Sequence, residues 1–461
     1  MTNQPKKATT RRKTADLKHK ISPAYFLSLE VENVLCFKGR QELNLSDKNC
    51  LPAQWTVILG NNGVGKTTIL RCLAGMEMIK YSLDEEDDFY MPILGNSQSL
   101  WNIWKEMVDI EFSDEAAEIR IDFVSKIPLS SFRQITYPEI QRDYVMVRIG
   151  TYSEIVSRED SGLICYGYGA TRRMGTTSLS DNHLSFNSAS LFSDDENLIN
   201  AEEWLLQTDY AIKSSSGSTK ARLFKQFNNI ISILKIILPD VENIRISFDK
   251  YLDRPTAEFS TPFGWVRLSS LGLGYRTTIS WMVDLAVRLF KRYPDSEDPL
   301  AEPAIVLVDE IDLHMHPQWQ RTIIEFLTER FPNTQFIVTA HSPLVVQAAQ
   351  DANIVLLRRE GDRVVIDNDP EIIKNWRVDQ VLTSVFEMPS ARPAKIEPLL
   401  ARRQEILTKS KLTKADKEEL KELEEKIGTL PTAETFEDIK AMDIIRRAAK
   451  LLEKSGAEVV E

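Results

Sequence analysis

The stretch GNNGVGKT, residues 60–67, constrains the fold of this chain more than any other part of the sequence. It satisfies the pattern GxxxxGK[ST] in full, between a buried-strand pattern at 55–59 and a helical pattern that begins near Lys66. Glycines let the backbone curl its N–H groups around phosphate oxygens, and a helix N-terminus favours negative charge. A chance match in a glycine-rich turn does not account for the flanking strand and helix. The sequence therefore predicts an α/β fold with a phosphate-binding loop.

This loop predicts ATP and Mg²⁺ as cofactors. The side chain of Lys66 is expected to reach the β and γ phosphates, and the hydroxyl of Thr67 is expected to bind Mg²⁺. Backbone amides of the loop are expected to surround the phosphates. The predicted nucleotide-binding residues of the loop are Gly60, Asn61, Asn62, Gly63, Val64, Gly65, Lys66, Thr67 and Thr68.

A second apolar run, residues 305–308, ends in an acidic pair, which is the Walker B pattern. A strand here is expected to deliver Asp309 to the magnesium ion and Glu310 to the water that attacks the γ-phosphate. The alternative is a zinc site that includes His314 and His316. These histidines are two residues apart, whereas a helical HExxH site needs histidines four apart. The acidic pair is therefore interpreted as part of a nucleotide site.

Two further stretches add candidate residues to this site. TAHSP follows a predicted buried strand and places His341 at the strand end, where it is expected to hydrogen-bond the γ-phosphate. LSSLGLGYRTT precedes Walker B and opens a predicted helix, so that Gly272 and Gly274 are expected to face an anion. The predicted catalytic residues are Glu310, His341 and Lys66, and the predicted metal ligands are Thr67 and Asp309.

With these motifs the chain resembles the ATP-binding-cassette (ABC) ATPases, in the branch that contains SMC, RecF and the ATPase half of OLD proteins. LEVENVLCFKG is similar to the opening hairpin of that family, with its turn expected at 38–40, and DEIDLHMHPQWQ is similar to Walker B and the loop after it. The resemblance implies a homodimer or a higher homo-oligomer, in which the signature loop of one copy caps the ATP held by another. Gly272 stands where the family has its signature serine, and Ser269 or Ser270 remain alternative hydroxyl donors. No counterpart of the Q-loop glutamine is identified.

Stretches outside these motifs resemble the compact ATPases of bacterial anti-phage systems. They are CYGYGATRR, LINAEEWLLQTDYA and NWRVDQVLTSVF, and they are most similar to the PtuA-type ATPases of Septu and retron systems and less similar to the AriA type of PARIS systems. The resemblance implies an AAA-family ATPase subunit that scaffolds and gates a separate effector, expected to be an HNH-type nuclease. Two alternatives remain open: a RecF-like DNA-repair ATPase, and an ATP-locked scaffold or sensor with negligible turnover.

Composition and spacing set limits on these alternatives. Three of the five histidines belong to the ATPase motifs, so a built-in HNH nuclease is not expected. The net charge of −11 leaves only local basic stretches, at 1–22 and 171–173, for contact with DNA or RNA. About two hundred residues separate the P-loop from the signature stretch, too few for an SMC-type arm.

The four cysteines form no CxxC pair, and no apolar run approaches the ~20 residues of a membrane span. A cytoplasmic protein without membrane contact is expected.

Three regions are expected along the 461 residues. Residues 1–22 are expected to form a disordered basic tail. Residues 23–390 are expected to form an ABC-type ATPase domain, with an insertion of helix and loop at about 76–254. Residues 391–461, rich in Lys, Glu, Leu and Ala, are expected to form a C-terminal α-helical region.

Overall fold

The computed structural model describes most of the chain, in two compact units, 1–381 and 382–461. The described residues are 23–82, 88–92, 117–125, 142–149, 162–176, 186–238, 240–251, 253–370, 377–386, 388, 393–409 and 413–427. The predicted tail, 1–22, and the end of the predicted C-terminal region, 428–461, lie outside them. The boundary between the two units falls nine residues before the one expected after residue 390.

A six-stranded sheet forms the centre of the first unit, in the order β15-β14-β3-β13-β12-β8. Its strands are β3 (Trp55–Gly60), β8 (Cys165–Tyr168), β12 (Ala304–Val308), β13 (Thr334–Thr339), β14 (Asn353–Glu360) and β15 (Arg363–Asp367). Only β15 runs antiparallel to its neighbour. Every residue of β3, β8, β12 and β13 is buried, as expected for parallel strands covered on both faces. The predicted α/β class is confirmed.

Helices and a second sheet cover the two faces of the central sheet. On one face, residues such as Ile58 and Ile337 share a hydrophobic core with α1 and with the second sheet. On the other face, Trp55 of β3 donates a hydrogen bond to Thr328, and Tyr168 of β8 packs against Trp281. The helices of this part are α1 (Lys66–Gly75), α3 (Ala189–Phe192), α6 (Leu273–Arg292), α7 (Pro317–Gln320), α8 (Ile323–Arg330) and α9 (Pro343–Ala348).

The second sheet is antiparallel, in the order β2-β1-β6-β7. Its strands are β1 (Ala24–Val34), β2 (Phe37–Asn44), β6 (Ala117–Ser125) and β7 (Arg142–Ile149). The hairpin turn expected at 38–40 is wrong, because Val34 already pairs with Phe37 and the turn lies at Leu35 and Cys36. Phe37 is fully buried in the core, which places it inside the strand, and Leu35 takes a positive φ of 49° to make the tight turn.

The region expected to be helix and loop, about 76–254, differs in the structure, because it supplies strands to both sheets. In β6, Ile119, Ile121 and Phe123 alternate with more exposed residues and are buried on one face. The short strand β8 pairs with β12, which lies far away in the sequence. Other elements of this region are β4 (Met78–Ser82), β5 (Asp88–Pro92), α4 (Ala201–Ser214), α5 (Gly217–Ile237) and β9 (Asn243–Asp249).

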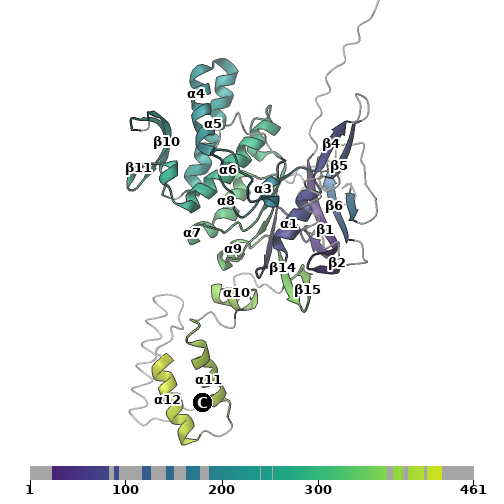
Figure 1. Cartoon of the computed structure of the whole chain (residues 1–461), viewed down its shortest axis with the longest axis vertical. Coiled ribbons are helices and arrows are strands. Elements are labelled where there is room, and N and C mark those ends of the chain that lie inside the picture. Colours follow the sequence, from purple (N-terminus) through teal and green to yellow (C-terminus); the bar gives the residue numbers. More distant parts are fainter. Residues whose placement is uncertain are drawn as a thin grey trace, which may run out of the picture. The chain divides into compact units, whose positions relative to one another are not determined.

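A helical pair and a small sheet lie before α6. Helices α4 and α5 lie side by side (Figure 1). Strand β9 pairs with β10 (Arg254–Thr261), which pairs with β11 (Gly264–Arg267), and a short 3-10 turn (Leu268–Ser270) leads to α6. None of the described helices combines the length and the hydropathy needed to cross a membrane.

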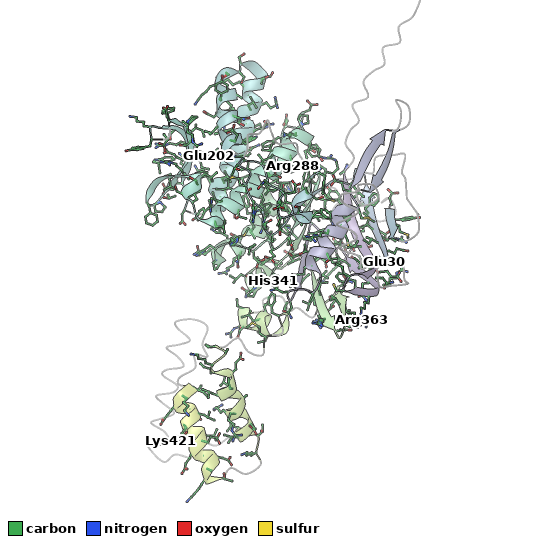
Figure 2. The ribbon with its side chains drawn as sticks, in the orientation of Figure 1. Glu30, Glu202, Arg288, His341, Arg363 and Lys421 are labelled. Carbon is green, nitrogen blue, oxygen red and sulfur yellow. The ribbon has the colours of Figure 1, made fainter. Side chains whose placement is uncertain are left out.

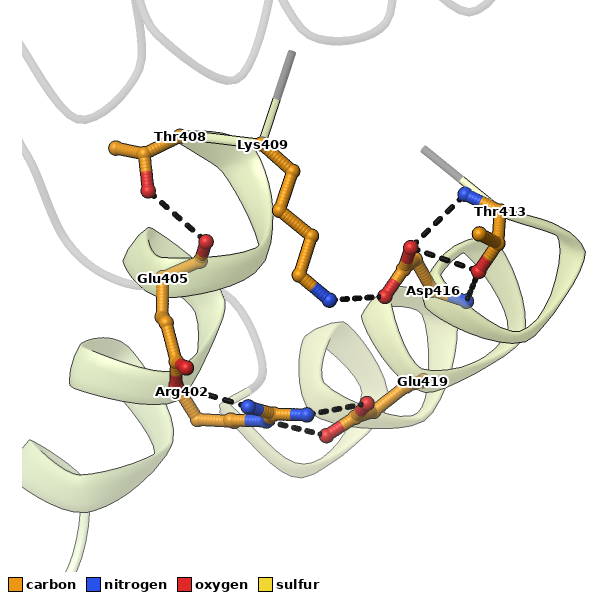
Figure 3. Close-up of polar contacts among 7 residues, drawn as sticks. All are labelled: Arg402, Glu405, Thr408, Lys409, Thr413, Asp416 and Glu419. Atoms are coloured by element: carbon orange, nitrogen blue, oxygen red, sulfur yellow. Dashed lines mark hydrogen bonds and ion pairs between the residues drawn. The ribbon is translucent and has the colours of Figure 1, made fainter. Parts of the chain in front are cut away.

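The second unit contains a helical hairpin. Helix α10 (Val378–Ser384) spans the division between the units, and α11 (Glu397–Leu407) and α12 (Lys414–Ile427) form the hairpin. Figure 3 shows Thr413 and Asp416 at the start of α12, each donating a main-chain N–H to the side chain of the other. Hydrogen bonds from Lys409 and Thr413 hold the pKa of Asp416 well below its usual range. Arg402 joins the two helices through two hydrogen bonds to Glu419, of 2.7 and 3.1 Å.

Candidate nucleotide-binding site

The predicted phosphate-binding loop runs from the end of β3 to the start of α1. Gly60, Gly63 and Gly65 have φ values of 147°, 77° and 84°, in the region that favours glycine. Nζ of Lys66 donates hydrogen bonds to the carbonyl oxygens of Gly60 and Asn61, at 2.9 and 2.8 Å. Its burial lowers the pKa of Lys66, while the nearby carboxylates, Asp309 first among them, oppose this shift. The loop therefore holds a partly desolvated cation over its own backbone.

The turn of the N-terminal hairpin packs directly on this loop, a contact that the sequence did not predict. A Cβ atom at Gly65 would lie 2.7 Å from Sγ of Cys36 and 2.8 Å from the ring of Phe37. Only glycine fits at this position, both for its φ and for the space around it. The hairpin and the loop are consequently packed as one piece.

Asp309 is held at the end of β12 by three hydrogen bonds. Its Oδ2 accepts from the hydroxyl of Thr67 at 2.7 Å, and its Oδ1 accepts from the hydroxyl of Thr339 at 2.6 Å. Its main-chain N–H donates to the carbonyl oxygen of Tyr168 at 2.8 Å. Mg²⁺ prefers oxygen ligands and is usually bound by one or two protein oxygens together with substrate phosphates and water. The hydroxyl of Thr67 and the carboxylate of Asp309 fit this requirement.

The histidines of the loop after Walker B do not gather around these oxygens. Nδ1 of His316 accepts a hydrogen bond from the main-chain N–H of Gln318 and caps α7. His314 is exposed and has a positive φ of 63°. No group of three or more His, Cys, Asp or Glu side chains in the described part of the chain is arranged to hold a metal ion.

Glu310 and His341 face a common space at the ends of β12 and β13. Oε1 of Glu310 lies 4.0 Å from Nε2 of His341, and both side chains are partly exposed. Burial is the main cause that lowers the pKa of His341, and the positive charge of Lys66 adds to it, so neutral imidazole is favoured at pH 7. The main-chain N–H of His341 donates to both carboxylate oxygens of Asp312, at 3.2 Å each. His341 is labelled in Figure 2.

The main chain of Glu310 adopts a strained conformation. Its φ of 49° lies in the left-handed region, which costs a residue with a side chain about 1 kcal/mol or more. Its N–H donates to the hydroxyl of Thr339 at 2.7 Å, and its carbonyl oxygen accepts from Nη2 of Arg172, also at 2.7 Å. Such strain at a candidate site is typical of a residue whose side chain must point in one direction.

The two predicted signature glycines lie at the start of α6, away from this cluster of contacts. Gly272 caps the helix, and a Cβ atom there would have only the ring of Tyr275 nearby, at 3.9 Å. A Cβ atom at Gly274 would lie 2.2 Å from the carbonyl oxygen of His314. Gly274 therefore lets the first turn of α6 pack closely on the loop that follows Walker B.

Side-chain contacts thus join the P-loop to Walker B and Walker B to His341, whereas Gly272 and Gly274 lie at the start of α6. Sequence reasoning missed Thr339 and Asp312, and it assigned Arg172 wrongly: the stretch 171–173 was offered for contact with DNA or RNA, but Arg172 is buried and donates to Glu310. Thr339 carried a usable signal, since it is a polar residue at the end of an apolar strand that pairs with β3. Arg172 carried none, because its partner Glu310 lies 138 residues further on.

A family model described as "AAA domain, putative AbiEii toxin, Type IV TA system" matches residues 55–347, more than half of the chain. The chain belongs to this AAA-domain family. The match includes both the P-loop and Walker B, and it ends within α9, six residues after His341. All the residues of the cluster described above therefore lie inside the AAA domain.

Two curated relatives of this AAA-domain protein come from defence systems. The Septu protein PtuA of Bacillus mycoides (strain KBAB4) is 25% identical over 382 residues, which are 82% of this chain and 46% of that protein. The retron Vc95 probable ATPase of Vibrio cholerae serotype O1 biovar El Tor is 36% identical over 135 residues, 29% of this chain and 26% of that protein. The chain thus spans less than half the length of these relatives.

Among solved structures, the AAA-domain protein is similar to an SMC head bound to the C-winged helix domain of ScpA. The sequence identity is 15%, the TM-score is 0.41, and the similarity covers 74% of this chain and 97% of that chain. The strand order of the protein's own sheets defines its α/β fold.

Proposed function

We propose that this protein is the ATP-binding and ATP-hydrolysing subunit of an anti-phage defence complex. The observation that carries the proposal is the meeting of Lys66, Thr67, Asp309, Glu310 and His341 at the carboxyl ends of β3, β12 and β13. Ligands of parallel α/β sheets bind at this edge. The defence role is supported by the names of the relatives, a Septu protein and a retron ATPase.

In this proposal the P-loop binds the triphosphate. Its backbone N–H groups surround the phosphates, and the ammonium of Lys66 exchanges its bonds to Gly60 and Asn61 for bonds to the β and γ phosphate oxygens. Thr67 and Asp309 would hold Mg²⁺, which would neutralise negative charge on the phosphates. Partial burial, which lowers the pKa of Lys66, also raises the gain from an anionic partner.

Glu310 and His341 then act on the γ-phosphate. The carboxylate of Glu310 orients the attacking water and accepts its proton. The neutral imidazole of His341 donates a hydrogen bond from Nε2 to a γ-phosphate oxygen, beside the same water. The two groups can act on the same phosphate because Oε1 of Glu310 and Nε2 of His341 lie 4.0 Å apart.

We propose further that two or more copies associate around ATP, with the start of α6 of one copy facing the nucleotide of the other. Gly274 supports this arrangement, because its close approach to His314 ties α6 to the loop after Walker B. Hydrolysis in one copy then moves the element that caps the nucleotide of the next. This cycle gates a separate effector protein, of the HNH-nuclease type.

A second candidate function is an ATP-locked scaffold or sensor with negligible turnover. It is favoured by Gly272, which gives the N-cap of α6 no hydroxyl at the position of the ABC signature serine. Ser269 and Ser270 lie in the preceding 3-10 turn and are exposed. The two candidates differ in phosphate release, which is fast enough to measure in the first and negligible in the second.

The proposed complex is tested by co-expression with the neighbouring genes, followed by measurement of the mass of the complex with and without ATP. An ATP-dependent complex that contains at least two copies of this chain and a nuclease supports the proposal. A monomer that gains no partner contradicts it. ATPase activity that DNA stimulates and that falls steeply with salt supports the RecF-like alternative instead.

A further inference from the structure

Arg172 is a buried arginine that the proposed reaction does not use. It lies just beyond the end of β8, and only 1% of its surface is exposed. Its Nη2 donates a 2.7 Å hydrogen bond to the carbonyl oxygen of Glu310. Its Nε and Nη1 are buried without a hydrogen-bond partner among the described residues. A guanidinium in this position is costly, so some other interaction must retain it.

Three carboxylates supply that interaction. The side chain of Arg172 is stabilised by the charges of Asp309, Asp312 and Glu310, in that order. Burial lowers the pKa of Arg172 to about 10, so the guanidinium still carries its charge at neutral pH. A buried charge is tolerated when opposite charges lie close to it. The negative charges around Walker B thus offset part of the cost of burying Arg172.

The contact with Glu310 is also a contact with the strained part of the main chain. Glu310 has a φ of 49°, and Arg172 itself has a φ of 36°. The N–H of Glu310 is fixed by Thr339 and its carbonyl oxygen by Arg172. A left-handed conformation persists only where the surroundings determine it from several sides. These two hydrogen bonds therefore fix the main chain of Glu310 on both sides of its Cα atom.

We propose that Arg172 is a positioning residue for Glu310. Its guanidinium holds the main chain of Glu310 in the left-handed conformation and so directs the carboxylate toward the space that His341 also faces. The inference rests on the proposed ATPase function and adds a residue that acts through Glu310 without contacting the nucleotide. The next residue, Arg173, has an exposed side chain and supplies a matched control.

The first test compares Arg172→Met with Arg173→Met in the full chain. Both remove one positive charge from the same segment, and only the first removes the hydrogen bond to Glu310. For Arg172→Met we expect kcat to fall about tenfold or more, with the Kd for ATP within about threefold of the unmutated value. Arg173→Met should leave both within about twofold. Arg172→Lys, which keeps a charge and a donor, should give a kcat between those of Arg172→Met and the unmutated protein.

The second test is a double-mutant cycle with Glu310→Gln. If Arg172 acts through Glu310, adding Arg172→Met to Glu310→Gln should change kcat by less than about twofold, because the group it positions is already disabled. A merely structural role predicts that the two effects multiply. Multiplied effects overturn the inference, as does an equal loss of ATP affinity and kcat in Arg172→Met. Melting curves report whether each variant folds.

The outcomes separate this inference from the proposed function. If the kcat of Arg172→Met equals that of the unmutated protein, only the role of Arg172 is overturned. If the kcat of Glu310→Gln equals that of the unmutated protein, the ATPase assignment of Glu310 is overturned. If Arg172→Met does not fold, the cycle is run with Arg172→Lys, and an unchanged kcat in that variant then overturns the inference. Absence of turnover in the unmutated protein contradicts the proposed function and, with it, the inference.

Discussion

The hydroxyl of Thr67 donates a 2.7 Å hydrogen bond to Oδ2 of Asp309, although 242 residues separate the two in the sequence. This contact joins the start of α1 to the end of β12 and places the two proposed Mg²⁺ ligands side by side. We expect Asp309→Asn to raise the Mg²⁺ concentration needed for half-maximal ATPase activity about tenfold or more, because an amide binds Mg²⁺ more weakly than a carboxylate. A magnesium titration of ATP hydrolysis measures this shift.

Thr67→Ser is the control for that titration. Serine keeps the hydroxyl that donates to Asp309, so the magnesium requirement should stay within about threefold of the unmutated value. Equal magnesium curves for Asp309→Asn and the unmutated protein would exclude Asp309 as a metal ligand.

Gly274→Ala is expected to destabilise the protein. The new Cβ would lie 2.2 Å from the carbonyl oxygen of His314, a main-chain atom that cannot move aside without shifting the loop after Walker B. Overpacking of this kind costs about 1–3 kcal/mol of the free energy of unfolding. Gly272→Ala, where the nearest atom is 3.9 Å away, should cost less than about 1 kcal/mol. Denaturant unfolding of both variants checks the difference, and equal stabilities would contradict this packing.

Gly272→Ser should increase ATP turnover. Serine would restore a hydroxyl at the N-cap of α6, where the family resemblance places a donor to the nucleotide of a second copy. One added hydrogen bond in the transition state, about 1 kcal/mol, corresponds to a severalfold rise in kcat. Steady-state phosphate release measures it. A kcat unchanged in Gly272→Ser, with ATP-dependent association intact, would mean that this turn does not reach the nucleotide.

We expect the stability of the protein to depend on pH because the pKa of Glu77 is raised. This carboxyl is buried just after α1, its Oε1 accepts a 3.1 Å hydrogen bond from Asn187, and burial raises its pKa to about 7. In the unfolded chain the pKa of this group is near 4.3. The folded state therefore binds one more proton between these values, and the free energy of unfolding falls as the pH rises from about 4.5 to about 7.

Glu77→Gln removes the carboxyl group that binds this proton. The free energy of unfolding should therefore change less between about pH 4.5 and about pH 7. At pH 8 the variant should gain on the order of 1–3 kcal/mol relative to the unmutated protein, and at pH 5 the gain should be much smaller. Urea unfolding at both pH values measures the difference. Parallel pH profiles for the two proteins would show that Glu77 keeps an ordinary pKa in the fold.

The parts of the site that the sequence could predict are those whose chemistry is local. GNNGVGKT and the acidic pair after β12 each carry their pattern within a dozen residues, and each follows a strand whose residues are mostly apolar. The contact between Arg172 and Glu310 depends on the pairing of β8 with β12, and a strand of four residues leaves too short a pattern to recognise. The turn at Leu35 was missed for a related reason: burial of Phe37, rather than the glycine at 39, determines where the hairpin reverses.

The central claim is that ATP bound at Lys66 is hydrolysed beside Glu310. The most direct measurement follows radiolabelled ATP on Glu310→Gln and on Lys66→Ala, each compared with the unmutated protein. Glu310→Gln should retain ATP, because it keeps the binding loop. It should release phosphate at least about 100-fold more slowly than the unmutated protein, because it loses the base. Lys66→Ala should bind ATP more weakly. Phosphate release by Glu310→Gln at the unmutated rate would contradict the account.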